Sequence, residues 1–292
     1  MDKIRIKVPA TSANIGSGFD CMGIAFQKYN TFEFEKMTLG VKFEGCDNKY
    51  ANVHNLSYVA YKAVCDKLGV KCNVRITTVD IDVPVSRGLG SSATLIVAGA
   101  VGANILNGNR LTREQIFAIC NDIEGHPDNI APALYGGLCA SVVIDGTPVT
   151  VKYPISEEVY FTAVIPDFEV RTRDARATLP KQINHRDAIF NLSRTAILPH
   201  ALETANFPLI KIATQDSIHE KYKRRLFRNI SDVETIAYEC GATSFMISGA
   251  GSTCLCISDR PIEKELNEAI SRLENNWRAF SLIVDDEGAR EA

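Results

Sequence analysis

Apolar and polar residues alternate at the start of the chain. Ile4, Ile6 and Val8 are separated by Arg5 and Lys7, and a period of two predicts a strand with one buried face. A glycine-rich turn is expected next, over 10–18. Similar short apolar or β-branched runs predict further strands at 32–34, 74–83, 159–165, 244–247, 254–257 and 280–284.

Apolar residues spaced by three and four positions predict helices between these strands. The expected helices cover 53–68, 93–106, 112–124, 187–201, 231–241 and 262–275. Gly69 stands where a glycine ends a helix, and Thr112 with Gln115 forms a capping box. Ser231 and Glu234 have the same spacing and predict a second cap.

Helices and strands are mixed in both halves of the chain. The 292 residues fit about two domains, and a stretch with two prolines at 148–154 is the best boundary between them. The sequence therefore predicts an α+β protein with domains at 1–152 and 153–292.

The composition and charge of the chain argue against several classes of protein. Hydrophobic residues make up 46% and charged residues 23%, with 32 Lys and Arg against 35 Asp and Glu. Since nucleic-acid and polybasic membrane binders need clustered positive charge, we expect neither partner. No apolar run approaches the ~18 residues of a membrane span. Nine cysteines without a CxxC pair indicate buried thiols in a reducing cytoplasm.

Several familiar motifs are incomplete. No Walker-type phosphate loop occurs. The His185-Arg186-Asp187 triplet resembles a protein-kinase catalytic loop, but the Asp-Phe pair of that family precedes it here instead of following. The histidines show no zinc-ligand spacing.

The most informative run joins the strand at 74–83 to the helix at 93–106. Its glycines allow a close turn around an anion, and its serines fall at a helix start, where free N–H groups attract phosphate. A tight strand-to-helix turn with a serine as N-cap is the alternative. The run includes Pro84, Ser86, Arg87, Gly88, Leu89, Gly90, Ser91, Ser92, Ala93 and Thr94.

This run resembles the phosphate-binding signature of the GHMP kinases. The segments 8–20 (VPATSANIGSGFD) and 248–253 (SGAGST) are similar to the first and third motifs of that superfamily. Within it, the segments 124–137, 174–180 and 286–290 resemble the homoserine kinase family. The resemblance implies a two-domain fold with a left-handed βαβ unit in the N-terminal domain and a ferredoxin-like C-terminal domain.

The resemblance also implies a reaction, the transfer of a phosphoryl group from ATP to L-homoserine on the route to threonine. Ser92 and Glu124 correspond to the Mg²⁺ site, where hard oxygen ligands are needed. Asp128 and Asn129 correspond to the catalytic positions beside the accepting hydroxyl. Without the resemblance, Glu124 reads as a solvated helix end and the Pro-Asp-Asn sequence as a turn.

Other positions match the substrate and nucleotide sites of the family. Arg176 corresponds to the arginine that binds the substrate carboxylate, and Asp20 suits the ammonium group. A second arginine of the family falls on Lys223, so Arg224 or Arg225 is an alternative. The remaining matches are Asn14, Gly249 and Gly251 for the substrate and Asn55 for adenine. Local turn or capping bonds are the alternative for the Asn and Asp residues.

Two other functions stay open at this point. One is a different GHMP kinase, for example one acting on mevalonate, and the other is a non-catalytic ATP-binding member of the fold. The expected ligands are ATP, Mg²⁺ and L-homoserine, and a homodimer is left open.

Overall fold

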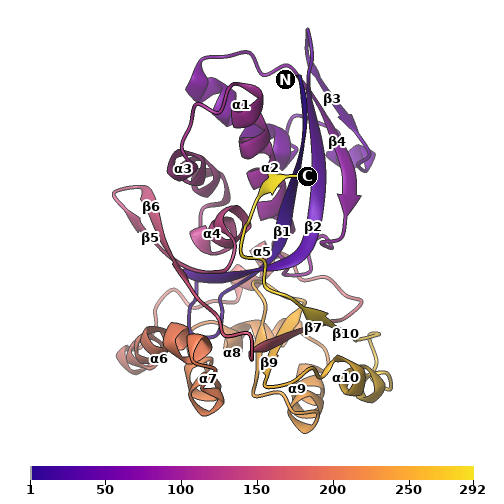
Figure 1. Ribbon diagram of the computed structural model, residues 1–292. Coiled ribbons are helices and arrows are strands. Elements are labelled where there is room, and N and C mark those ends of the chain that lie inside the picture. Colours follow the sequence, from indigo (N-terminus) through magenta and orange to yellow (C-terminus); the bar gives the residue numbers. More distant parts are fainter. Residues whose placement is uncertain (1) are drawn as a thin grey trace.

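The larger of two β-sheets is built on a long antiparallel hairpin. In the computed structural model, which describes residues 2–292, strands β1 (Lys3–Ala13) and β2 (Met22–Lys36) pair along most of their length (Figure 1). The sheet order is β11-β1-β2-β4-β3; β5 also pairs with β2, and β6 pairs with β5. The other strands are β3 (Val41–Glu44), β4 (Val74–Ile81), β5 (Leu138–Ile144), β6 (Thr147–Tyr153) and β11 (Arg290–Glu291).

Four helices cover one face of this sheet (Figure 1). They are α1 (Leu56–Leu68), α2 (Ser91–Leu106), α3 (Arg113–Glu124) and α4 (Pro127–Tyr135). Helix α1 is the crossover between the parallel strands β3 and β4, which makes a βαβ unit. The core between sheet and helices includes Ile6, Phe34, Tyr61, Ile96 and Phe117, all nearly or fully buried.

The second half of the chain has a four-stranded antiparallel sheet of order β10-β7-β9-β8. In chain order this is 4-1-3-2, the arrangement of a ferredoxin-like fold. Its strands are β7 (Tyr160–Ile165), β8 (Ser244–Ile247), β9 (Cys254–Ser258) and β10 (Arg278–Leu282). Its helices are α5 (Thr172–Ala177), α6 (His185–Glu203), α7 (Phe207–Ala213), α8 (Glu220–Lys223), α9 (Ile230–Glu239) and α10 (Glu263–Ile270). The α+β fold predicted from the sequence is confirmed.

Some expected elements differ in detail. Helix α1 begins at Leu56 instead of residue 53, because the Asn55 side chain accepts a hydrogen bond from the Ser57 N–H and caps it. The predicted cap at Ser231 is wrong, since the N-cap of α9 is Asn229 in the left-handed region. The stretch 148–154 is mostly strand β6. The division at 152/153 stays a prediction.

A C-terminal strap, residues 285–291, returns to the larger sheet. Asp285 accepts hydrogen bonds from the Tyr29 hydroxyl (2.6 Å), from Arg290 Nη2 (2.9 Å) and from the Gly288 N–H (2.7 Å). The Ala289 N–H donates to the Ala133 carbonyl of α4. The strap therefore ties α4 to the edge of the sheet.

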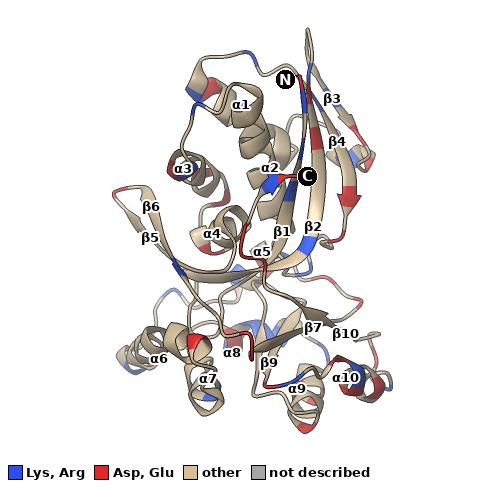
Figure 2. Cartoon of the chain, viewed as in Figure 1, with Lys and Arg blue, Asp and Glu red and all other residues tan. Residues whose placement is uncertain are grey.

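Charged residues of both signs occur over both halves (Figure 2). Within residues 2–292, no helix has the length and apolar character that crossing a membrane requires.

Candidate active site

A cavity of about 550 Å³ lies where the two halves of the chain meet. Its walls come from the larger sheet, the starts of α1, α2 and α4, helix α5 and the loop after β8. Most of the predicted site residues line it: Asn14, Asn55, Ser86, Arg87, Gly88, Gly90, Ser91, Ser92, Glu124, Asp128, Asn129, Arg176, Lys223, Gly249 and Gly251.

The phosphate loop, residues 84–90, turns sharply into α2. Gly88 and Gly90 have φ of +79° and +71°, a region that favours glycine. A Cβ at Gly88 would lie 2.3 Å from the Ser248 carbonyl oxygen. Gly90 is the N-cap of α2 and no side chain caps this helix, so its first N–H groups remain available to an anion. The alternative of a serine N-cap is wrong.

Some residues of the predicted phosphate run do not line the cavity. Arg87 does, but its guanidinium donates to the carbonyl oxygens of Pro166 (2.8 Å) and Asp167 (3.0 Å), which ties the loop to the C-terminal half. Thr94 is buried and accepts a hydrogen bond from Asn30. Pro84, Leu89 and Ala93 also lie outside the lining.

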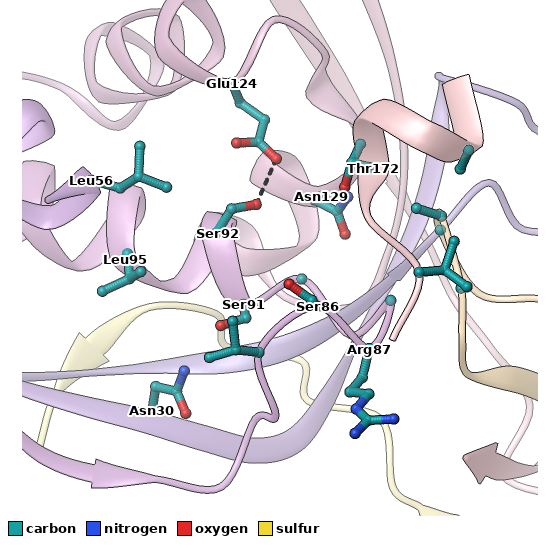
Figure 3. A pocket seen from close by; sticks show the side chains of 18 of the residues that line it. Asn30, Leu56, Ser86, Arg87, Ser91, Ser92, Leu95, Glu124, Asn129 and Thr172 are labelled. Carbon is teal, nitrogen blue, oxygen red and sulfur yellow. Dashed lines mark hydrogen bonds between the residues drawn. The ribbon is translucent and has the colours of Figure 1, made fainter. Parts of the chain in front are cut away.

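The Ser92 hydroxyl and the Glu124 carboxylate meet above the phosphate loop. Ser92 Oγ donates to Glu124 Oε1 at 2.8 Å, and both side chains face the cavity (Figure 3). Helix α2 supplies the serine from its first turn and α3 supplies the glutamate from its last residue. Two oxygen donors of this kind fit Mg²⁺, which prefers hard ligands and keeps several waters.

Asp128 and Asn129 occupy the first turn of α4, where Pro127 is the first helical residue. Asp128 is 1% exposed, and its Oδ1 lies 2.5 Å from His126 Nδ1. Among residues 2–292, its second oxygen, Oδ2, has no hydrogen-bond partner. A buried carboxylate oxygen without a partner is costly, which indicates that a ligand completes the site.

The contact with Asp128 also affects the histidine. Burial alone would lower the pKa of His126, but the hydrogen bond and charge of Asp128, with a contribution from Glu124, raise it above the ordinary value. The Asp128 carboxylate therefore favours the protonated form of the His126 ring.

Arg176 lines the cavity and forms a bidentate ion pair with Asp20, a predicted site residue that is not itself part of the lining. Arg176 Nη2 donates to Asp20 Oδ1 at 2.7 Å and Nη1 donates to Oδ2 at 3.1 Å. The Asn14 side chain accepts a hydrogen bond from the Asp20 N–H, so the local bond expected for an Asn in this loop is present. Asp20, His126 and Asp128 each place one ligand-type atom within 4.8 Å of the others. Opposite charges are thus concentrated at one end of the cavity.

Lys223 lies at the same end and is 2% exposed. Its Nζ donates to the Gly249 carbonyl at 2.9 Å and lies 5.2 Å from the centre of the Phe19 ring. Burial lowers the pKa of Lys223 to about 8, against the opposing effect of nearby acidic groups such as Glu220. Arg224 instead pairs with Glu234 and is not in the cavity lining. Of the three cations considered for this position, Lys223 lines the cavity, and Arg224 and Arg225 do not.

The other end of the cavity is more apolar. Asn55 lines it while also capping α1. The apolar and aromatic side chains there are Phe32, Tyr50, Leu56, Ile81, Val85 and Leu95.

Some lining residues were not singled out from the sequence. His126 and Phe19 stand inside the quoted motif segments, but nothing in the spacing marked them as facing the cavity. Thr172 also lines it (Figure 3), and only the docking of α5 against the N-terminal half brings it there.

Comparison with known proteins supplies the family. Residues 55–137 match the model of the GHMP kinases N terminal domain, and residues 200–279 match that of the GHMP kinases C terminal domain. A homoserine kinase of Clostridium botulinum (strain 657 / Type Ba4) is 41% identical over 288 residues, which is 98% of this chain and 97% of the relative.

Solved structures of kinases have a fold similar to that of this chain. The crystal structure of homoserine kinase from Cytophaga hutchinsonii has a TM-score of 0.91 at 27% identity, with 100% of this chain and 98% of that chain covered. L. major mevalonate kinase in complex with R-mevalonate has a TM-score of 0.73 at 16% identity, with 97% and 96% covered. The second likeness shows the fold alone.

Proposed function

The chain belongs to the homoserine kinase family of the GHMP kinases, and from that premise we propose that it transfers the γ-phosphoryl group of ATP to the side-chain hydroxyl of L-homoserine. The products are ADP and O-phospho-L-homoserine, in a step of threonine biosynthesis. One observation carries the assignment to an amino-acid substrate: the paired charges of Arg176 and Asp20 stand close to the buried carboxylate of Asp128, one oxygen of which has no hydrogen-bond partner among residues 2–292.

The charged end of the cavity suits an amino acid. In our proposal the substrate ammonium binds Asp20 and the carboxylate binds Arg176, whose fork matches a carboxylate. The ammonium of Lys223 adds a second positive charge for the carboxylate, with Asn14 and the backbone at Gly249 and 251 as further contacts. The Asp20–Arg176 pair must open for this, so each charge exchanges one partner for another.

Phosphoryl transfer needs an aligned hydroxyl and neutralised phosphate charge, with little covalent work by the protein. Asp128 Oδ2 accepts the hydrogen bond of the substrate hydroxyl and can take its proton as the oxygen–phosphorus bond forms. The Asn129 amide faces the same space and donates to the transferring group. The free N–H groups at 90–92 bind the phosphates.

We propose Ser92 and Glu124 as the protein ligands of Mg²⁺. Their donor atoms are hard oxygens 2.8 Å apart at the cavity wall, which supports the assignment. When bound, the ion neutralises charge on the phosphate oxygens. The adenine base is expected at the apolar end, near Asn55.

A cytoplasmic location is also part of the proposal. All nine cysteines, each within the described residues, are free thiols, which supports a reducing cytoplasm. The homodimer left open by the sequence stays a prediction, and sedimentation of the purified protein would test it.

The deciding experiment is an acceptor-dependent ADP assay. Purified protein with ATP and Mg²⁺ should release ADP with L-homoserine and form O-phospho-L-homoserine, detectable by ³¹P NMR. Mevalonate and L-threonine at equal concentration serve as control alcohols. Faster turnover of mevalonate would favour another GHMP kinase, and ATP binding without any homoserine-dependent ADP would indicate a non-catalytic member.

A further inference from the structure

We propose that Thr11 is a positioning residue, whose hydroxyl holds the Asn129 carboxamide so that its NH₂ group faces the reacting atoms. The inference rests on the proposed function of Asn129. Thr11 is fully buried in β1 and is not part of the cavity lining. It therefore acts through Asn129 and not on the substrate.

The contact is short and joins distant parts of the chain. Thr11 Oγ1 donates to Asn129 Oδ1 at 2.7 Å, across 118 positions of sequence. In a planar carboxamide the oxygen and the nitrogen point to opposite sides, so a bond that holds Oδ1 toward β1 directs Nδ2 away from it. Because Asn129 lines the cavity, Nδ2 is the donor presented there.

Thr11 also contacts the phosphate loop. Its N–H donates to the Leu89 carbonyl at 3.1 Å. A Cβ at Gly90 would lie 1.9 Å from Thr11 Oγ1 and 3.2 Å from Asn129 Oδ1, so the glycine is required for the approach. One residue of β1 thus fixes the spacing between the loop that binds phosphate and the helix that carries Asn129.

Loss of the hydroxyl has a defined chemical consequence. Without a donor for Oδ1, the amide can rotate and present its oxygen to the cavity, where it repels the phosphate oxygens and the substrate hydroxyl oxygen. Since aligned donors contribute mainly to the transition state, kcat should fall while ATP binding is retained.

The test compares Thr11→Val, which removes the hydroxyl and keeps the shape, with Thr11→Ser, which keeps the hydroxyl. We expect Thr11→Val to lower kcat by on the order of 10-fold or more, with the ATP KM within about twofold of wild type. Thr11→Ser should retain most of the wild-type kcat. Thr214→Val is the matched control, because Thr214 is also buried and its hydroxyl makes one hydrogen bond, to the Ile210 carbonyl. It should leave kcat unchanged.

A double-mutant cycle separates positioning from a general structural effect. In the Asn129→Ala background, Thr11→Val should lower kcat by no more than about twofold further. Full multiplication of the two losses, or a Thr11→Val enzyme with wild-type kcat, would overturn the inference. If Thr11→Val melts well below wild type, Thr11→Ala is measured in its place under the same criteria. Failure of the proposed function is distinct, since wild-type protein would then release no homoserine-dependent ADP.

Discussion

Replacing Arg176 with lysine separates carboxylate binding from phosphoryl transfer. The substitution keeps a positive charge beside Asp20 but removes the planar fork that makes two bonds, at 2.7 and 3.1 Å. A lysine ammonium holds a carboxylate through one point contact at a time. The homoserine KM should therefore rise, and the ATP KM should not.

The structure sets the size of the effect. Losing one partner of a fully buried charge pair costs ~2–5 kcal/mol, but the side chains of Arg176 and Asp20 are 39% and 33% exposed. Solvent screening and the retained charge reduce the loss, to about 1–2 kcal/mol. At ~1.4 kcal/mol per tenfold, the homoserine KM should increase roughly 5- to 30-fold. Arg176→Ala should be worse, since Asp20 then lacks its cation.

The assay is steady-state ADP release with homoserine and ATP varied in turn. Arg173→Lys is the matched control, because Arg173 is on the same helix, has a 90% exposed side chain and is not in the cavity lining. It should behave as wild type. A homoserine KM for Arg176→Lys within about twofold of wild type, only ~0.4 kcal/mol, would remove Arg176 from the carboxylate site.

Three further predictions follow from the same geometry. Glu124→Gln should lower kcat by on the order of 100-fold at subsaturating Mg²⁺, because it removes charge from the proposed metal site; near-normal turnover in a Mg²⁺ titration would exclude the assignment. Burial lowers the pKa of Lys223 to about 8, so this side chain is charged below that pH and loses its charge above it. The homoserine KM should therefore rise above pH 8. In Lys223→Arg that rise should move to higher pH, and any rise that remains is due to the substrate amine. Burial would raise the pKa of Asp285, but the hydrogen bonds from Tyr29 and Arg290 lower it overall. Asp285→Asn should therefore reduce the free energy of unfolding, measured in urea, by about 3 kcal/mol at pH 7. This loss should shrink as pH falls below 4, where Asp285 of the wild type becomes protonated; a difference that stays constant with pH would contradict the charge-based explanation.

Patterns among neighbouring residues in the sequence were enough to predict much of the fold. The capping box at Thr112 and Gln115 is present as predicted, and Gly69 ends α1 in the left-handed region. Both signals depend on residues within one turn of each other. Strand β6 was missed because Pro148 reads as a break, although a proline is tolerated on a strand that pairs only on one side.

The site was less accessible to sequence reasoning. The phosphate loop has its own glycine signature, but Arg176 and Asp20 are 156 positions apart, and only the resemblance to a family brought them together. Asp128 falls in a Pro-Asp-Asn sequence that also fits a turn, and the helix α4 that presents it became evident only in the structure. Long-range pairing of this kind leaves no periodic trace in the chain.

The close approach of Gly88 to Ser248 constrains how the two halves can evolve or be engineered. The Ser248 hydroxyl donates to the Gly88 carbonyl, and the Thr253 N–H donates to the Arg87 carbonyl. The phosphate loop therefore takes its shape partly from the other half. A chimera that joins halves from two distant parents should keep activity only when the phosphate loop and the segment 248–253 come from the same parent, wherever the junction is placed.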